Sequence, residues 1–309
     1  MLKLSNECFN KVSYLLKNEA RDLEKYLYEY HFQGGSSKNI IKELKKYQND
    51  DGGFGKALES DFRQPDSSPM ATSIGIRILS EIEETEDTKN IIKSACKYFE
   101  LTFNEKRSGW YALNKEVNKY PHAPWWHYDV EKGMTVIDKN WGNPSAEILA
   151  YLYKYRNYTN LLDINYLIEY AIKYIEDKKV FESDNELFCY IKLFEILPED
   201  IKSQLKNRIS CGISQVIEYN RENWKDYVPL PLDFVSSPEK EKFGVINSKI
   251  NENLDYYVEL IEGNEGSLIN PPWGDSYYQG SLKPAYNEWK GVLTLKILKR
   301  LDNYNRIER

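Results

Sequence analysis

Apolar residues recur at spacings of three and four along most of this chain, which is the pattern of helices that bury one face. In residues 5–31 the stripe begins with Phe9, Val12 and Leu16, and two glycines follow the segment. A second helix is expected over about 38–48, after two serines that suit its cap. No segment alternates apolar and polar positions in the way a half-buried strand does. The pattern therefore predicts an all-α protein.

One arrangement recurs along the chain: a polar, aromatic loop, then a helix that is apolar on most sides, then an amphipathic helix. A helix that is apolar all round is surrounded by other helices. The expected inner helices begin near residues 68, 144, 184 and 287. Their separation by one or more units of about 40 residues is typical of stacked helical hairpins.

An open solenoid and a closed ring are both compatible with such hairpins. Long loops feeding the inner helices from one side favour the ring. We therefore predict a single α/α toroid, a helical-hairpin barrel of about 10–12 helices, over residues 1–309. The helices within residues 1–35 are expected to pack on the ring.

Charge and composition exclude some classes of protein. The formal net charge is −6 and no block of Lys and Arg exceeds one helix face, so nucleic-acid binding is not expected. The N-terminal residues lack the apolar core of a signal peptide, and no stretch is apolar enough to span a bilayer. We expect a cytoplasmic protein whose four scattered cysteines are reduced. Oligomeric state is not indicated.

The segment YQNDDGGFG, residues 47–55, resembles the QW-type repeat of terpenoid cyclases and the Gly-Gly-Phe repeat of protein prenyltransferase β-subunits. Gln48, Gly52, Gly53 and Phe54 match that pattern. The resemblance implies an α/α toroid in which the glutamine and the aromatic residue lie at the turn between an outer and an inner helix.

The same resemblance does not extend to the chemistry of those families. The DxDD acid motif of class II terpenoid cyclases is missing, and so is the Asp-x-Cys pair that binds zinc in prenyltransferases. We therefore expect neither a metal nor another cofactor. Carbohydrate hydrolases and lyases also use α/α barrels and stay open as an alternative.

Four long loops precede the expected inner helices, over residues 48–69, 104–142, 220–246 and 264–286. Loops of this length are usually functional or disordered, and these are too aromatic to be disordered. In the predicted ring they gather on one rim, where aromatic walls and convergent polar groups make a binding site. Alternatively, their rings plug the mouth. The residues expected to bind a small-molecule or oligosaccharide ligand are Trp125, Trp126, Trp141, Trp273, Tyr277, Tyr278, Arg63, His122 and Asp275.

Paired carboxyl groups are the favoured catalytic groups. A carboxyl group behind apolar walls has a raised pKa and can donate a proton, while a better-solvated partner acts as base. Asp129 follows an aromatic cluster and is the expected acid. The alternative interpretation of any one of these acids is that it caps a helix or pairs with Arg63. The candidate catalytic residues are Asp129, Asp61, Asp138, Glu147 and His127.

His122, His127 and Asp129 also invite a metal site, because imidazole and carboxylate are common ligands. The two histidines flank the sequence APWW and lack the i, i+4 spacing of a helical ligand pair. Acid–base roles or local hydrogen bonds are therefore favoured over metal binding.

Three functions remain open. The first is an enzyme resembling terpenoid cyclases and prenyltransferases, with acid–base chemistry on an isoprenoid-like small molecule in an aromatic, acidic pocket. The second is a carbohydrate-active hydrolase or lyase, which the polar loops suit. The third is a non-catalytic ligand-binding or scaffold protein.

Overall fold

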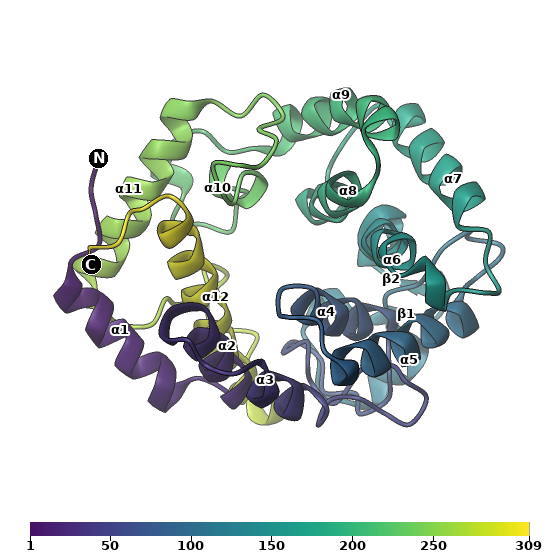
Figure 1. Ribbon diagram of the computed structural model, residues 1–309, viewed down its shortest axis with the longest axis horizontal. Coiled ribbons are helices and arrows are strands. Elements are labelled where there is room, and N and C mark those ends of the chain that lie inside the picture. The colour runs from purple at the N-terminus through teal and green to yellow at the C-terminus, as the bar shows by residue number, and fades with distance from the viewer. Residues whose placement is uncertain (309) are drawn as a thin grey trace. The chain divides into compact units, whose positions relative to one another are not determined.

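The computed structural model describes residues 1–308, and almost all regular structure in that range is helical (Figure 1). The described residues contain twelve α-helices and one pair of two-residue strands, so the prediction of an all-α protein is confirmed. The chain divides into two compact units. Unit 1 comprises Met1–Glu43 together with the segment from Val216 onward, and unit 2 comprises Leu44–Gln215. The single-domain ring stays a prediction.

Unit 2 contains six of the long helices and the strand pair. The helices are α4 (Pro69–Leu79), α5 (Glu86–Thr102), α6 (Gly142–Lys154), α7 (Ile164–Asp177), α8 (Asp184–Ile196) and α9 (Glu199–Val216). Short 3₁₀ helices and the antiparallel strands interrupt the loops, at η1 (Lys115–Lys119), η2 (Pro124–Trp126), β1 (Tyr128–Asp129), β2 (Met134–Thr135), η3 (Ile137–Lys139) and η4 (Arg156–Tyr158).

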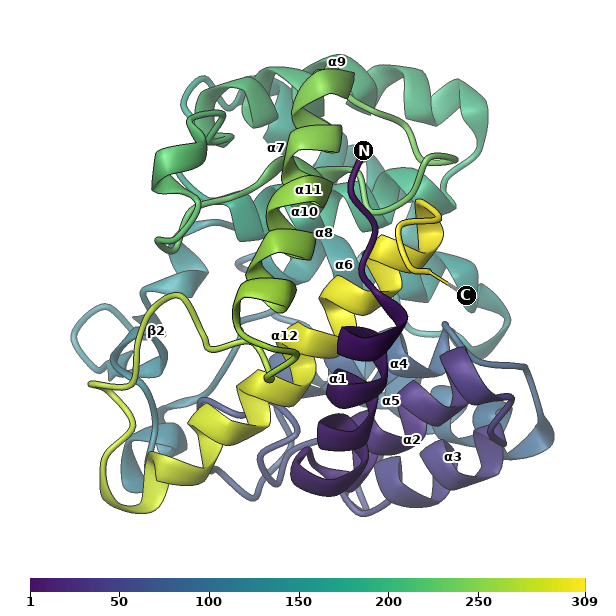
Figure 2. The ribbon, with the colours of Figure 1, turned by 90° about the vertical axis from the view of Figure 1, so that its left-hand side faces the viewer.

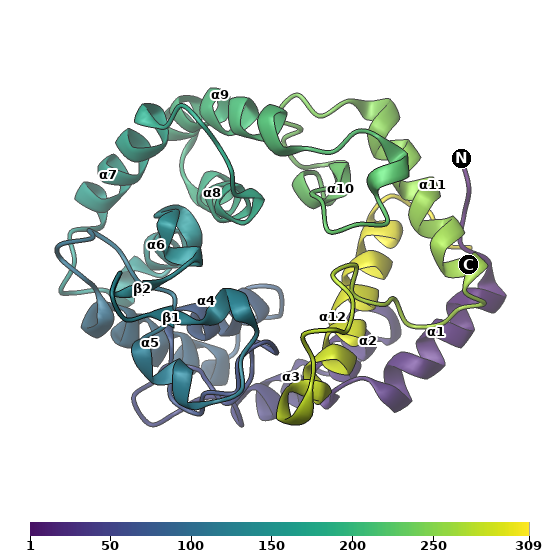
Figure 3. The same ribbon diagram turned by 180° about the vertical axis from the view of Figure 1, so that it is seen from behind.

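The helices of unit 2 form two rows. In the first row α6 lies between α4 and α8, and in the second row α5, α7 and α9 lie beside them (Figures 1 and 3). Every residue of α6 from Gly142 to Leu152 is buried, as expected of a helix that other helices surround. Ser68 caps α4 by accepting a hydrogen bond from the Ala71 amide, and Pro69 opens the helix.

The turn formed by residues 48–54 packs directly against α4 and α5. The Gln48 side-chain amide donates to the Gly52 carbonyl over 3.0 Å. Phe54 is fully buried, and its amide donates to Oγ1 of Thr72 in α4 over 2.9 Å. A Cβ added at Gly75 of α4 would stand 2.8 Å from the Phe54 ring, so the helix approaches that ring only because residue 75 is glycine.

Unit 1 is built around its longest helix. Its helices are α1 (Asn6–Glu19), α2 (Asp22–Gln33), α3 (Ser37–Leu44), η5 (Arg221–Asn223), α10 (Pro231–Phe234), α11 (Asn247–Gly263), η6 (Gly280–Leu282) and α12 (Lys283–Asn303). Helix α12 contacts α1, α2 and α11 (Figure 2). The expected continuous helix over residues 5–31 is wrong, because the backbone is extended at Ala20 and separates α1 from α2.

Two further expectations concern membranes and cysteines. No helix among residues 1–308 combines the length and the apolar character needed to cross a bilayer. Cys8, Cys96 and Cys189 are buried thiols, as expected, whereas Cys211 is half-buried.

Candidate functional site

The first two long loops meet on unit 2. Phe62 and His122 form an antiparallel bridge. The Arg63 amide donates to the Pro121 carbonyl over 2.9 Å, and the Ala123 amide donates to the Asp61 carbonyl over 2.8 Å. Residues 61–63 and 121–123 therefore run side by side, and the predicted site residues Asp61, Arg63 and His122 come from neighbouring backbone.

A proline-initiated 3₁₀ turn, η2, gives the two adjacent tryptophans different environments. Trp126 is buried with its ring edge-to-face against Phe62, 5.3 Å between ring centres. Trp125 is half-buried, and its indole N–H donates to Oδ2 of the buried Asp61 over 3.2 Å. Of the two rings predicted to bind ligand, Trp126 is part of the core, and Trp125 is the ring that reaches the surface.

His122 and His127, at the two ends of the segment that contains Trp125 and Trp126, form a hydrogen-bonded pair. Nδ1 of His122 lies 2.7 Å from the Tyr120 carbonyl oxygen, and Nε2 of His122 lies 3.1 Å from Nδ1 of His127. The rings are stacked, with 5.3 Å between centres and 22° between planes. The five-residue separation spans η2, whose turn brings the second imidazole back over the first.

These contacts determine where the protons lie when both rings are neutral. A carbonyl oxygen only accepts, so Nδ1 of His122 carries a proton and its Nε2 is an acceptor. Nδ1 of His127 must then donate to that acceptor, which leaves Nε2 of His127 unprotonated. His127 is exposed, and its Nε2 has no protein partner within residues 1–308. The pair thus presents a proton acceptor to solvent.

Asn118 positions this acceptor, and sequence reasoning had not selected it. Its Oδ1 accepts from the Tyr128 amide over 2.9 Å and its Nδ2 donates to the Tyr128 carbonyl over 2.8 Å. The clamp holds the backbone of the residue that follows His127. A side-chain amide can satisfy the N–H and the C=O of one residue in this way, but a single asparagine among many in the chain gives no sequence signal.

Asp129 has the reverse of the expected environment. Its carboxylate accepts from the Lys132 ammonium at 2.5 Å and from the amides of Glu131 and Lys132, each at 3.0 Å. These hydrogen bonds, the Lys132 side chain first, lower the pKa of Asp129. The prediction that Asp129 is an apolar-walled acid with a raised pKa is therefore wrong, and its carboxylate closes the turn between β1 and β2.

Asp138 is a buried carboxylate that organises the middle of the second loop. Oδ1 accepts from the Ala112 amide over 2.7 Å, and Oδ2 accepts from the amide and hydroxyl of Thr135 over 2.9 and 2.6 Å. Burial raises the pKa of Asp138, as expected of an acid. Both oxygens are nevertheless engaged by the protein, so its position indicates a structural role.

Glu147 projects between the helices of the first row. Its oxygens accept from Nε and Nη2 of Arg77 in α4, over 2.7 and 2.6 Å, and from the Tyr151 hydroxyl over 2.8 Å. Burial acts to raise its pKa, but the charge and hydrogen bonds of Arg77 outweigh burial and leave the pKa lowered. Glu147 is therefore an ionised clamp between α4 and α6, not a proton donor.

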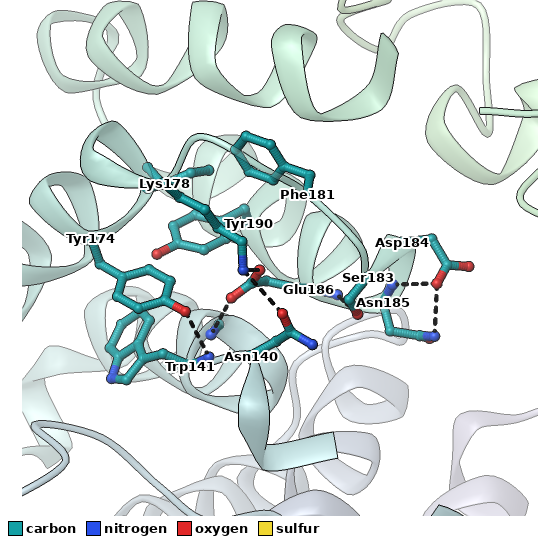
Figure 4. Close-up of polar contacts among 12 residues, drawn as sticks. Asn140, Trp141, Tyr174, Lys178, Phe181, Ser183, Asp184, Asn185, Glu186 and Tyr190 are labelled. Carbon is teal, nitrogen blue, oxygen red and sulfur yellow. Dashed lines mark hydrogen bonds and ion pairs between the residues drawn. The ribbon is translucent and has the colours of Figure 1, made fainter. Parts of the chain in front are cut away.

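Trp141 lies at the end of the second loop, where it packs against α7 and α8 (Figure 4). The ring is buried against Tyr170 and Tyr174. Next to it, Glu186 of α8 accepts from the Gly142 amide over 2.9 Å and from the Lys178 ammonium over 2.6 Å. The predicted ligand-binding role of Trp141 does not agree with this burial, because the ring faces the core of unit 2.

The remaining predicted residues lie in unit 1. The indole N–H of Trp273 donates to the hydroxyl of the buried Tyr278 over 2.5 Å. Tyr277 and Asp275 are exposed. The predicted site residues of unit 1 and those of unit 2 thus make their contacts within their own units. The prediction that all four loops gather on one rim stays a prediction.

Within residues 1–308, no group of three or more His, Cys, Asp and Glu side chains is arranged to hold a metal ion. The chain was compared with protein-family models, with curated proteins and with solved structures, and none of these comparisons found a match.

Proposed function

We propose that this chain is an enzyme that performs acid–base chemistry on a small, polar molecule, with His127 as the residue that exchanges the proton. The observation that carries the proposal is the hydrogen-bond chain from the Tyr120 carbonyl through His122 to His127. Histidine titrates near neutral pH and is the commonest general base.

The chain of hydrogen bonds gives each imidazole a defined task. Nε2 of His127 takes a proton from the substrate, and the ring becomes an imidazolium. Its Nδ1–H then donates to Nε2 of His122 as a charge-assisted hydrogen bond, which is stronger than the neutral one. His122 is held by the Tyr120 carbonyl and acts as a positioning residue that also shares the positive charge. Return of the proton from Nε2 completes a general-acid step.

Trp125 and Asp61 supply a surface for the substrate beside His127. Asp61 fixes the indole through its N–H, so the half-buried ring keeps one orientation. A fixed aromatic face loses little conformational freedom when a ligand stacks on it. The exposed side chains of this region are mostly polar, which suits a hydroxyl-bearing substrate such as a carbohydrate better than an isoprenoid.

We further propose an α/α toroid related to the terpenoid cyclases and protein prenyltransferases. Support comes from the Gln48–Phe54 turn, which packs on α4, and from the alternation of helices between the two rows of unit 2. The DxDD and zinc motifs are missing from the sequence, so the proposed chemistry rests on the histidine pair and not on those families.

Activity screening tests the proposal. The full chain is incubated with neutral oligosaccharides, uronate-containing oligosaccharides and isoprenyl diphosphates, and products are followed by mass spectrometry. We expect turnover of a saccharide, and a loss of kcat/KM of about 100-fold or more in His127→Asn. Lys132→Ala, which removes an exposed neighbour, is the matched control. Turnover that His127→Asn leaves intact would overturn the proposal.

Nitrogen NMR tests the proton positions without any substrate. The chain has three histidines, so substitution of each one assigns the imidazole signals. In the neutral rings we expect His122 and His127 both to be protonated at Nδ1 and unprotonated at Nε2. A neutral His127 protonated at Nε2 would contradict the hydrogen-bond chain.

A further inference from the structure

Unit 1 carries a cluster of aromatic rings, here named the Trp273 platform, that has no part in the histidine site. Trp273 stands between Tyr227 and Trp289, with ring centres 5.3 and 5.2 Å apart and planes at 81° and 89°. The rings come from three separate segments: the loop after η5, the loop before η6, and α12. Tyr277 lies in the same loop as Trp273, four residues further along the chain.

The platform is open to solvent. Tyr227 is 60% exposed and Tyr277 is 49% exposed, while Trp273 and Trp289 are half-buried. Large aromatic rings normally bury most of their area, because exposing them forfeits the hydrophobic gain. A group of exposed rings at one place marks a surface for interaction.

The central ring is held rigidly. The Trp273 indole N–H donates to the Tyr278 hydroxyl over 2.5 Å, and the buried Tyr278 ring contacts Tyr286 at 5.5 Å between centres. Gly274, at φ +75°, allows the tight turn that follows Trp273. A rigid ring loses little entropy on binding, so the platform is organised before any ligand arrives.

The neighbours of the rings identify the chemical class of the ligand. The loop PPWGDSYYQGS contains no large aliphatic residue, and its exposed members include Asp275, Ser276 and Gln279. A membrane surface would be met by aliphatic side chains such as leucine as well as by aromatic rings. A pyranose ring instead offers an apolar C–H face, which stacks on an aromatic ring, and hydroxyl groups at its edge, which bind polar side chains.

We propose that the Trp273 platform is a binding site for neutral oligosaccharides. Stacking on Trp273 and Tyr227 would supply the affinity, and the polar side chains around them would orient the sugar hydroxyls. Charged residues of both signs adjoin the rings in the sequence, among them Lys225, Lys290, Asp226 and Asp275. Neither sign of charge dominates, which suits a neutral ligand. The proposal does not depend on catalysis at His127.

Affinity gel electrophoresis of the full chain tests the site, with soluble β-glucan, xylan, galactomannan and starch as the probes. We expect retardation by at least one of them. Trp273→Ala should weaken that binding about tenfold or more, and Tyr227→Ala should weaken it less. Tyr14→Ala is the matched control, since Tyr14 is a 64% exposed tyrosine of α1 in the same unit and lies outside the platform. Binding by this control should equal that of the unchanged chain.

Three outcomes would overturn the site. One is that no polysaccharide retards the chain; another is that Tyr227→Ala and Trp273→Ala, shown by circular dichroism to be folded, bind as tightly as the unchanged chain. The third is binding to liposomes, lost in the same variants, in place of polysaccharides. His127→Asn should retain the binding, so failure of the site and failure of the proposed catalysis are distinguishable.

Discussion

Two long loops that carry tryptophan, one in each unit, differ in how far their aromatic rings are buried. In the loop of residues 104–142, in unit 2, most of the indole area is buried. In the loop of residues 264–282, in unit 1, Trp273 stands among exposed rings. Four of these indole N–H groups have different partners in buried and in half-buried rings. Those of Trp110 and Trp141 donate to backbone carbonyls, whereas those of Trp125 and Trp273 donate to the side chains of Asp61 and Tyr278. A tryptophan-rich loop alone therefore does not indicate a ligand site.

The largest expected loss of stability comes from removing a buried ring of the loop of residues 104–142. Trp141→Ala removes a buried ring from its contacts with Tyr170 and Tyr174 and should lower the free energy of unfolding by about 3–5 kcal/mol. Urea denaturation measures it. A loss below about 1 kcal/mol would mean that the buried loop is not anchored by this ring.

The second effect concerns the ion pair that joins the helices next to the buried loop. Glu147→Gln leaves Arg77 without its counter-charge, and since Arg77 is partly exposed we expect a loss of about 2–3 kcal/mol. The folded-state pKa of Glu147 lies below its ordinary value of 4.5. Its contribution is therefore present above about pH 4.5 and is lost as pH falls through the folded-state pKa.

The pH dependence provides the control for that substitution. Between pH 7 and pH 3, the unfolding free energy of Glu147→Gln should fall less steeply than that of the unchanged chain. Equal slopes in the two proteins would show that Glu147 is not ionised beside Arg77.

A smaller loss of stability is expected in the loop of residues 264–282, where the rings are more exposed. Trp273→Ala removes a half-buried ring and its two edge-to-face contacts, and should cost about 1 kcal/mol of stability. The same denaturation measurement applies. A loss as large as that of Trp141→Ala would mean that the two loops are built alike.

The smallest effect is at Asp129. Asp129→Asn removes an exposed ion pair with Lys132, so the midpoint of urea denaturation should stay unchanged, as should any turnover that depends on His127. A variant without activity would restore Asp129 as a catalytic candidate.

Cap residues and apolar runs predicted where the first-row helices of unit 2 begin, because both signals are local in the sequence: Ser68 and Ser183 cap α4 and α8. The expected starts near residues 68, 144 and 184 lie within two residues of the starts of α4, α6 and α8. The start near residue 287 is four residues late, since Lys283 and Pro284 already belong to α12. The break at Ala20 has no glycine or proline to mark it.

The candidate site was less predictable, because its chemistry depends on contacts between distant residues. Arg77 and Glu147 are 70 positions apart, and nothing in a single sequence pairs them. The Asp129–Lys132 pair could have been predicted from the sequence, because the two residues are only three positions apart. His122 and His127 were recognised as candidates, but their tautomers follow from the Tyr120 carbonyl, which any residue provides.

The contact between Phe54 and Gly75 limits how the sequence can change over evolutionary time. A methyl group at position 75 would occupy space that the Phe54 ring already fills. In sequences that share this turn, a residue larger than glycine at position 75 should occur together with a smaller one at position 54. The two positions are 21 residues apart. Their covariation would identify related proteins that keep this packing arrangement even where the surface loops have diverged.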